Sequence, residues 1–187
     1  MSTTISGTAL NVATITSPTL ITPIINGMGS SILTSGTAVA STSGTSIDFT
    51  GIPSWAKRIT VMFNGVSTNG ASNPLIQIGS GSVTATGYLA GSRDTTSTSA
   101  GGGSTYTTGF GIQSVGAVNL LYGNTVTNTL SGNIWASSST IYVLTGSGYM
   151  LVAAGAVTLS GALDRVRITT VNSTDTFDAG SINILYE

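Results

Sequence analysis

The chain has 187 residues and a formal net charge of −1; 40% of its residues are hydrophobic and only 6% are charged. It contains no histidine and no cysteine, so it lacks the usual members of catalytic triads, thiol nucleophiles and zinc sites. Nucleic acid as a partner would need clustered basic residues, and a membrane-spanning helix would need a long apolar run. We therefore expect a non-enzymatic protein with no metal, no cofactor, no nucleic-acid partner and no membrane insertion.

The abundance of serine, threonine and glycine raises the question of disorder. Disordered chains usually combine low hydrophobicity with high net charge, whereas this chain has many Val, Ile and Leu residues in short runs and almost no net charge. Threonine is β-branched and suits a half-buried, pleated surface. We predict an all-β fold whose exposed positions carry hydroxyl groups. A surface so poor in charge gives weak protection against self-association, which favours a chain built for permanent assembly.

Residues 1–36 are predicted to form an extended stem or attachment arm. Apolar residues alternate there with Thr and Ser, and Pro18 and Pro23 each remove a hydrogen-bond donor that a central strand would need. The segment offers too little apolar surface to fold alone, so copies of the same chain are its simplest partner. The stem would be extended or intertwined, and the apolar residues expected at the contact between copies include Ile15, Leu20 and Ile24.

Residues 37–187 are predicted to form a β domain. Short apolar or alternating runs recur between Gly, Asn and Ser turn signals, and many short strands at this spacing indicate a sandwich, jelly roll or barrel. We favour a jelly-roll-like antiparallel β-sandwich without helices. The predicted strands are Thr37–Ala40, Ser46–Phe49, Arg58–Phe63, Leu75–Gly79, Thr84–Leu89, Thr105–Ile112, Ala117–Tyr122, Thr127–Trp135, Thr140–Leu144, Tyr149–Ala153, Val166–Thr170 and Ser181–Tyr186.

The stretch 91–104 is the most loop-like part of the domain, and surface loops often carry recognition. Tyr88 and Tyr106 flank it and could stack on a sugar ring, while Arg93 and Asp94 within it could add polar contacts to a glycan. The alternative is a hairpin tip without a ligand, with the two tyrosines in the core and a local salt bridge between Arg93 and Asp94.

The few remaining charged residues have structural interpretations. Asp175 and Asp178 are the closest pair of acids, and their spacing suits a turn or cap better than a glycosidase pair or a calcium site. The alternation Arg165-Val166-Arg167 puts both arginines on one face of a strand. We expect them to join Asp164, Lys57 and Arg58 in one ion-pair cluster that pins strand register or bridges subunits.

Several stretches resemble the C-terminal domain of bacteriophage tail-fibre and receptor-binding proteins. They are TSGTAVASTSGTSIDFTGIPSWAKRITVMFNGVSTNG, PLIQIGSGSVTATGYLAGS, GYMLVAAGAVTLSG and the ending RVRITTVNSTDTFDAGSINILYE. The early stretch TITSPTLITPIINGMG resembles the Thr- and Pro-rich stem that often precedes that domain. The resemblance is strong at 36–92 and 140–187 and weak at 93–139.

This resemblance implies a structural protein of the virion, a homotrimeric tail fibre of a tailed phage. The N-terminal segment would attach to other virion proteins, and the β-sandwich tip would face a host-surface glycan. No catalytic motif carries over. The alternatives are a capsid or head decoration protein or head fibre without receptor binding, and a free carbohydrate-binding module or adhesin. An adhesin would need an export signal, which the sequence does not predict, and a depolymerase would need a paired-carboxylate cleft.

Overall fold

The computed structural model describes residues 33–95, 103–113, 116–117, 119–146 and 148–187. The predicted stem residues Ile15, Leu20 and Ile24 lie outside these ranges. Every regular element in the described ranges is a β-strand, and every strand pairing is antiparallel. The all-β prediction is therefore confirmed. No helix long and apolar enough to cross a membrane occurs in the part of the chain that the structure describes.

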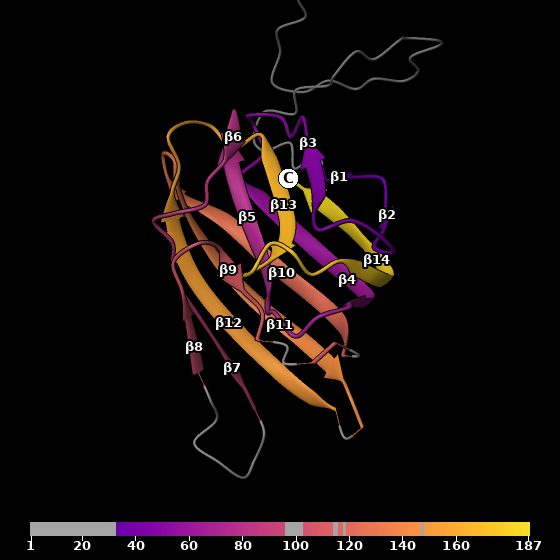
Figure 1. Cartoon of the computed structure of the whole chain (residues 1–187). Helices are drawn as coiled ribbons and strands as arrows, with labels where there is room; N and C mark the ends of the chain where they lie inside the picture. Colours follow the sequence, from indigo (N-terminus) through magenta and orange to yellow (C-terminus); the bar gives the residue numbers. More distant parts are fainter. Residues whose placement is uncertain (1–32, 96–102, 114–115, 118, 147) are drawn as a thin grey trace, which may run out of the picture. The chain divides into compact units, whose positions relative to one another are not determined.

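The strands form two sheets that make the two layers of a sandwich (Figure 1). The larger, nine-stranded sheet has the path β1 (Thr34–Ser35), β14 (Phe177–Tyr186), β4 (Arg58–Thr68), β10 (Leu120–Ser131), β11 (Ile134–Leu144), β12 (Tyr149–Thr158), β7 (Leu89–Asp94) and β8 (Gly103–Tyr106), with β2 (Val39–Ala40) beside β14. The smaller, five-stranded sheet has the path β3 (Ile47–Thr50), β13 (Arg165–Thr170), β5 (Pro74–Ser80) and β6 (Ser82–Val83), with β9 (Phe110–Gly111) beside β5.

The core lies between the two sheets because apolar residues alternate along their strands. In β11, the alternate residues Trp135, Ser137, Ser139, Ile141 and Val143 are buried, while the residues next to them in the sequence face outward. The smaller sheet contributes buried residues such as Ile78 and Val166. This alternation gives each sheet one face toward the core and one face away from it.

Part of this core is made of hydroxyl groups paired across β10 and β11. Thr125 Oγ1 and Ser139 Oγ lie 2.8 Å apart, and Thr127 donates to Ser137 Oγ at 3.0 Å. All four side chains are buried. A buried polar group is tolerated when its hydrogen bonds are made inside the protein, so a chain rich in Ser and Thr can still build a packed interior.

Several predicted boundaries differ from the structure: of the predicted strand Thr84–Leu89 only Leu89 is in a strand, and the predicted strand Thr127–Trp135 spans the end of β10 and the start of β11. Thr34 and Ser35 already pair with Tyr186 and Leu185, and residues 32–187 form one compact unit, so the predicted division at residue 36 falls inside this unit. The predicted loop 91–104 is shorter, because its first residues extend β7 and its last residues begin β8. Pairing of β7 with both β12 and β8 overrides the loop-like composition of these ends.

Candidate functional site

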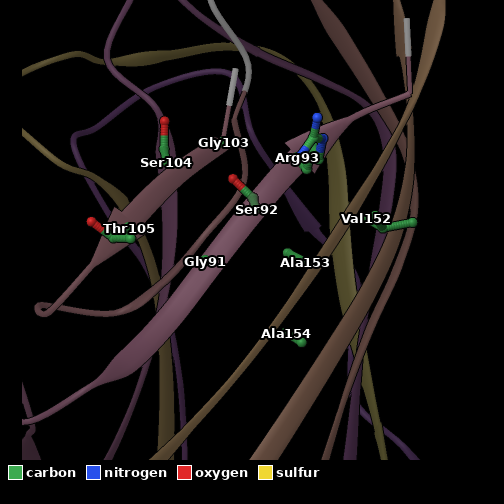
Figure 2. A pocket seen from close by; sticks show the side chains of 9 residues that line it. All are labelled: Gly91, Ser92, Arg93, Gly103, Ser104, Thr105, Val152, Ala153 and Ala154. Carbon is green, nitrogen blue, oxygen red and sulfur yellow. The ribbon is translucent and has the colours of Figure 1, made fainter. Parts of the chain in front are cut away.

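A shallow groove of about 510 Å³ lies over β7, β8 and β12 at one margin of the larger sheet (Figure 2). All of its lining residues come from three neighbouring strands. They are Gly91, Ser92 and Arg93 of β7, Gly103, Ser104 and Thr105 of β8, and Val152, Ala153 and Ala154 of β12. We refer to this site as the β7–β8 groove.

The strand register explains how the groove is formed. Gly91 lies opposite Ala154 on β12 and opposite Thr105 on β8, so these three residues share one face of the sheet. In the next row, Arg93 lies opposite Val152 and Gly103. The intervening residues point the other way: Ser92 is buried and Leu151 is fully buried. The groove is therefore on the outer face, with glycine and alanine as its floor and longer side chains around it.

Arg93 differs from the other arginines in its contacts. Arg58 pairs with Glu187, Arg165 with Asp164, and Arg167 with Asp48. The side chain of Arg93 makes no hydrogen bond or ion pair with any part of the chain that the structure describes, and it is exposed. Asp94 follows on the opposite face of β7, opposite Leu151, and is not among the lining residues. Of the four residues predicted to contact a ligand, Arg93 is the one that lines the groove.

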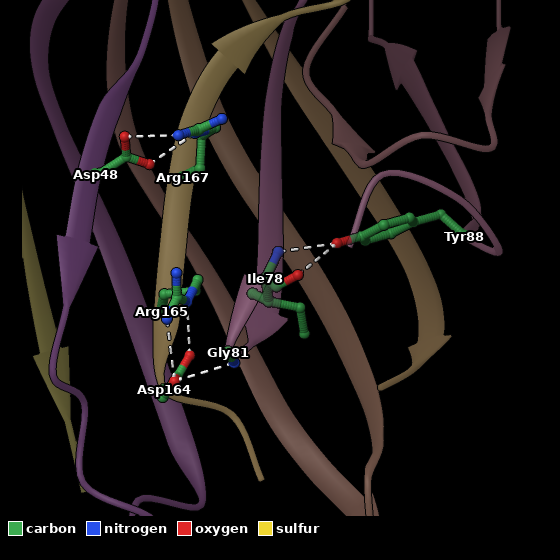
Figure 3. A network of polar contacts seen from close by, with 7 residues as sticks. All are labelled: Asp48, Ile78, Gly81, Tyr88, Asp164, Arg165 and Arg167. Atoms are coloured by element: carbon green, nitrogen blue, oxygen red, sulfur yellow. Dashed lines mark hydrogen bonds and ion pairs between the residues drawn. The ribbon is translucent and has the colours of Figure 1, made fainter. Parts of the chain in front are cut away.

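Tyr88 lies in the core, with 1% of its surface exposed. Its hydroxyl group accepts a hydrogen bond from the Ile78 N–H at 2.8 Å and donates one to the Ile78 carbonyl at 3.3 Å (Figure 3). Its ring packs edge-on against Phe110, with ring centroids 4.9 Å apart. Burial raises the pKa of Tyr88 to about 12, although the hydrogen bond from Ile78 acts in the other direction. Burial thus removes this ring from the ligand-facing position that the sequence suggested.

Tyr106 is also buried, at the end of β8. Its hydroxyl oxygen accepts a hydrogen bond from Asn73 Nδ2 at 3.0 Å and another from Ser92 Oγ at 3.3 Å. The ring therefore ties the strand that carries the groove to the smaller sheet, and it cannot also stack on a sugar. Its role here is to position β7, which corrects the predicted ligand contact.

The predicted ion-pair cluster is three separate pairs. Arg167 donates to both oxygens of Asp48 at 2.7 and 2.9 Å, directly across β13 and β3, and Arg165 donates to both oxygens of Asp164 at 2.7 and 3.2 Å (Figure 3). The hydrogen bond from Arg165 is the main reason that the pKa of Asp164 is lowered, with a further contribution from the Gly81 N–H. Arg58 lies on the other sheet, which is why it pairs with Glu187 instead.

The pair between Arg167 and Asp48 should contribute little to stability, because both side chains are about 38% exposed. We expect Arg167→Ala to lower the free energy of unfolding by less than about 1 kcal/mol. Urea denaturation of this variant, of Asp48→Ala and of the double variant measures the coupling between the two groups. Dissociation of an assembly by Arg167→Ala would instead support a contact between subunits.

The two closest acids make different contacts, Asp175 in the loop before β14 and Asp178 within β14. Asp175 accepts hydrogen bonds from the Ser72 N–H at 2.9 Å and from Asn172 Nδ2 at 2.6 Å, and these bonds, that from Asn172 first, lower its pKa. Asp178 accepts a hydrogen bond from Ser67 Oγ. In the described part of the chain, no group of three or more His, Cys, Asp or Glu residues could hold a metal ion. The contacts of Asp175 agree with the predicted turn, whereas Asp178 lies in a strand and links β14 to β4 through Ser67.

A second surface feature lies on the same outer face, on β10, β11 and β12. Leu120 lies opposite Leu144, and Tyr142 lies between Tyr122 and Met150 in the next row. Tyr142, Leu144 and Met150 are 38, 39 and 41% exposed. We call these five residues the apolar patch. This patch was not among the predictions from the sequence. Two features of the sequence indicate it: apolar residues alternate along β11, and no charged residue lies between Asp94 and Asp164.

The fold and the two surface features define a two-layer antiparallel β protein with a small groove and, on β10, β11 and β12, an uncharged, partly apolar surface. No protein-family model matches the chain, and no match is found among curated proteins or solved structures. The resemblance to phage fibre domains therefore rests on the sequence stretches quoted above.

Proposed function

We propose that this chain is a non-enzymatic structural protein of a virus particle, a homotrimeric tail fibre of a tailed phage that contributes to recognition of a host-surface carbohydrate. In this proposal, residues 1–36 attach the fibre to other virion proteins, and the β domain is its outer part. The observation that carries the proposal is the uncharged, partly apolar outward surface of β10, β11 and β12 in the larger sheet. The resemblance of the sequence to phage fibre domains supplies the kind of particle.

The distribution of charge distinguishes strands β10, β11 and β12 of the larger sheet from the outer face of the smaller sheet. Strands β10, β11 and β12 contain no charged residue, and their outward positions hold the apolar patch among small and hydroxyl side chains. The smaller sheet carries Asp48, Arg165 and Arg167 on its outer face. Exposed apolar side chains that are contiguous on a surface mark interaction sites. The outward surface of β10, β11 and β12 is therefore the one suited to contact with another protein.

Other copies of the same chain are the partners that this face fits best. A face without charge cannot select a partner by electrostatic complementarity, whereas identical copies bring the same uncharged, apolar surface. Strands β10, β11 and β12 present roughly 500 Å², a large part of the area of about 800 Å² that each partner buries in a stable interface. Three copies that meet through these faces form a closed assembly without an exposed apolar patch.

The assembly is tested by mass and by charge placed in the patch. Sedimentation of the full chain should give three times 18.7 kDa. We expect the double variant Leu144→Lys/Met150→Lys to sediment as a monomer with an unchanged β-type circular dichroism spectrum, since buried unpaired charges are costly. Val171→Lys is the matched control, because Val171 is 49% exposed and follows the smaller sheet.

Two results would count against this part of the proposal. A wild-type monomer at micromolar concentration would overturn the trimer. A trimer that tolerates both lysines would show that the copies meet elsewhere. A capsid decoration protein could use the same patch but would need no ligand groove. Adsorption of the purified protein to host cells separates a receptor-binding fibre from such a protein.

A further inference from the structure

We propose that the β7–β8 groove binds an anionic saccharide, a short glycan that carries a carboxylate or phosphate group, with Arg93 as the residue that contacts the anion. This inference rests on the proposed recognition function and names its ligand class and its site. Three features of the groove carry it: its glycine floor, the uncommitted guanidinium group, and the apolar and hydroxyl groups beside them.

The glycines of the groove are not required by the packing of the chain. A Cβ atom at Gly103 would meet only Ser92 O, at 3.7 Å, and one at Gly91 would meet only Ser104 O, at 3.3 Å, which a small shift relieves. Neither residue has a positive φ. By contrast, a Cβ atom at Gly155 would come within 2.6 Å of Ala90. Glycine inside a strand weakens it and often marks a place where a ligand approaches the backbone closely.

Arg93 supplies the charge at this floor. A guanidinium group binds carboxylate and phosphate through two parallel hydrogen bonds. Within this chain, Arg165 and Arg167 bind the carboxylates of Asp164 and Asp48. Arg93 has no such partner among the described residues and lies opposite Gly103, at the floor of the groove. Strands β10, β11 and β12 carry no acid that would repel an anion from this face.

The rest of the lining suits a sugar ring. Val152 and Ala154 provide an apolar surface for the C–H face of a pyranose, and Thr105 provides a hydroxyl group on the same side. Strand β8 ends the path of its sheet, so one edge of its backbone is not paired within that sheet. Small-molecule sites typically have volumes of about 300–1,000 Å³, and the groove, at about 510 Å³, is large enough for a short oligosaccharide.

Calorimetric titration of the full chain with matched sugars tests the inference. The anionic probes are trigalacturonate and mannose 6-phosphate, and the neutral probes are galactotriose and mannose. We expect at least one anionic probe to bind at least tenfold more tightly than its neutral counterpart, with affinity falling as salt is added. The probe that binds shows whether the acid group is a carboxylate or a phosphate.

Substitutions test whether the anionic probe binds in the β7–β8 groove. Arg93→Ala should reduce the affinity for the anionic probe at least tenfold, and Arg93→Lys should restore part of it, because lysine keeps the charge without the planar fork. Gly103→Val should abolish binding by filling the floor, and its circular dichroism spectrum and mass report whether it folds. Arg58→Ala is the control, since that arginine lies on β4 and pairs with Glu187.

The outcomes separate this inference from the proposed function. Equal binding of neutral and anionic sugars, or anionic binding that survives Arg93→Ala, overturns the inference. If no probe binds while the wild-type trimer still adsorbs to cells, the groove is not the site and the fibre function stands. If the protein neither assembles nor adsorbs, the proposed function fails, whatever the groove binds.

Discussion

Replacement of Tyr88 by phenylalanine is expected to lower the free energy of unfolding by about 1–3 kcal/mol, the cost of leaving a buried polar group without its partner. On one edge of β5, β9 pairs with Leu75 and Ile76, and β6 pairs with Gly79 and Ser80. Ile78 lies between these two pairings, and its N–H donates to the Tyr88 hydroxyl group. That hydroxyl therefore fills a gap in the sheet, and urea denaturation measures what its loss costs.

The same contact predicts how stability depends on high pH. Tyr88 has a pKa of about 12 in the folded protein, above the ordinary tyrosine pKa of 10.0, so between these values the folded state retains the phenol proton that the unfolded state loses. The stability that depends on this proton is fully present below pH 10 and is lost as pH rises from about 10 to about 12. The difference in unfolding free energy between wild type and Tyr88→Phe should therefore shrink over this range.

The exposed position Tyr142→Phe is the control, because it removes a phenol without disturbing the core. If Tyr88→Phe were as stable as this control at neutral pH, the hydroxyl of Tyr88 would not be the partner that Ile78 needs. Solvent would then have to reach that strand edge.

Substitution of Gly111 by alanine is expected to destabilise the fold by about 1–3 kcal/mol, as overpacking does, and to weaken the β7–β8 groove as well. A Cβ atom at Gly111 would lie 2.4 Å from three atoms of the Tyr106 ring, which rests against this glycine. The ring would have to move, and its hydroxyl would then leave Asn73 and Ser92. Thermal unfolding measures the first effect, and saccharide titration measures the second.

Gly146→Ala is the matched control, since a Cβ atom there would meet nothing within 4 Å. We expect it to leave both the unfolding temperature and saccharide binding unchanged. A Gly111→Ala protein with full stability and full affinity would show that Tyr106 does not hold the groove strand in place.

The sequence was sufficient to predict the all-β class, because alternation such as that of Ile47 and Phe49 in β3 records which side of a strand is buried. The prediction from the sequence was wrong at the middle of β10, where pairing with neighbouring strands overrides the local turn signal. Gly123-Asn124 predicts a turn, yet β10 runs through it and pairs with both β4 and β11. Gly123 has a φ of 129° and lies near a register shift, so the glycine marks an irregularity within a strand.

The groove shows why a site of this kind is harder to predict. Arg93 could be singled out from a loop-like stretch, but its neighbours Val152 and Ala154 are brought to it by the register of β12 against β7. No local pattern encodes a register between strands so far apart in the chain. The same limit explains Tyr88, whose buried partner is defined by a gap between β6 and β9.

The paired hydroxyl groups between β10 and β11 have a consequence for how the chain avoids misalignment. A slip of two residues preserves every inward and outward position, so apolar contacts alone discriminate poorly against it. After such a slip, Thr127 would face Trp135 and Ser139 would face Gly123, leaving two buried hydroxyl groups without partners. The hydroxyl-rich composition that first suggested disorder thus penalises incorrect alignment of these long strands and favours a single arrangement.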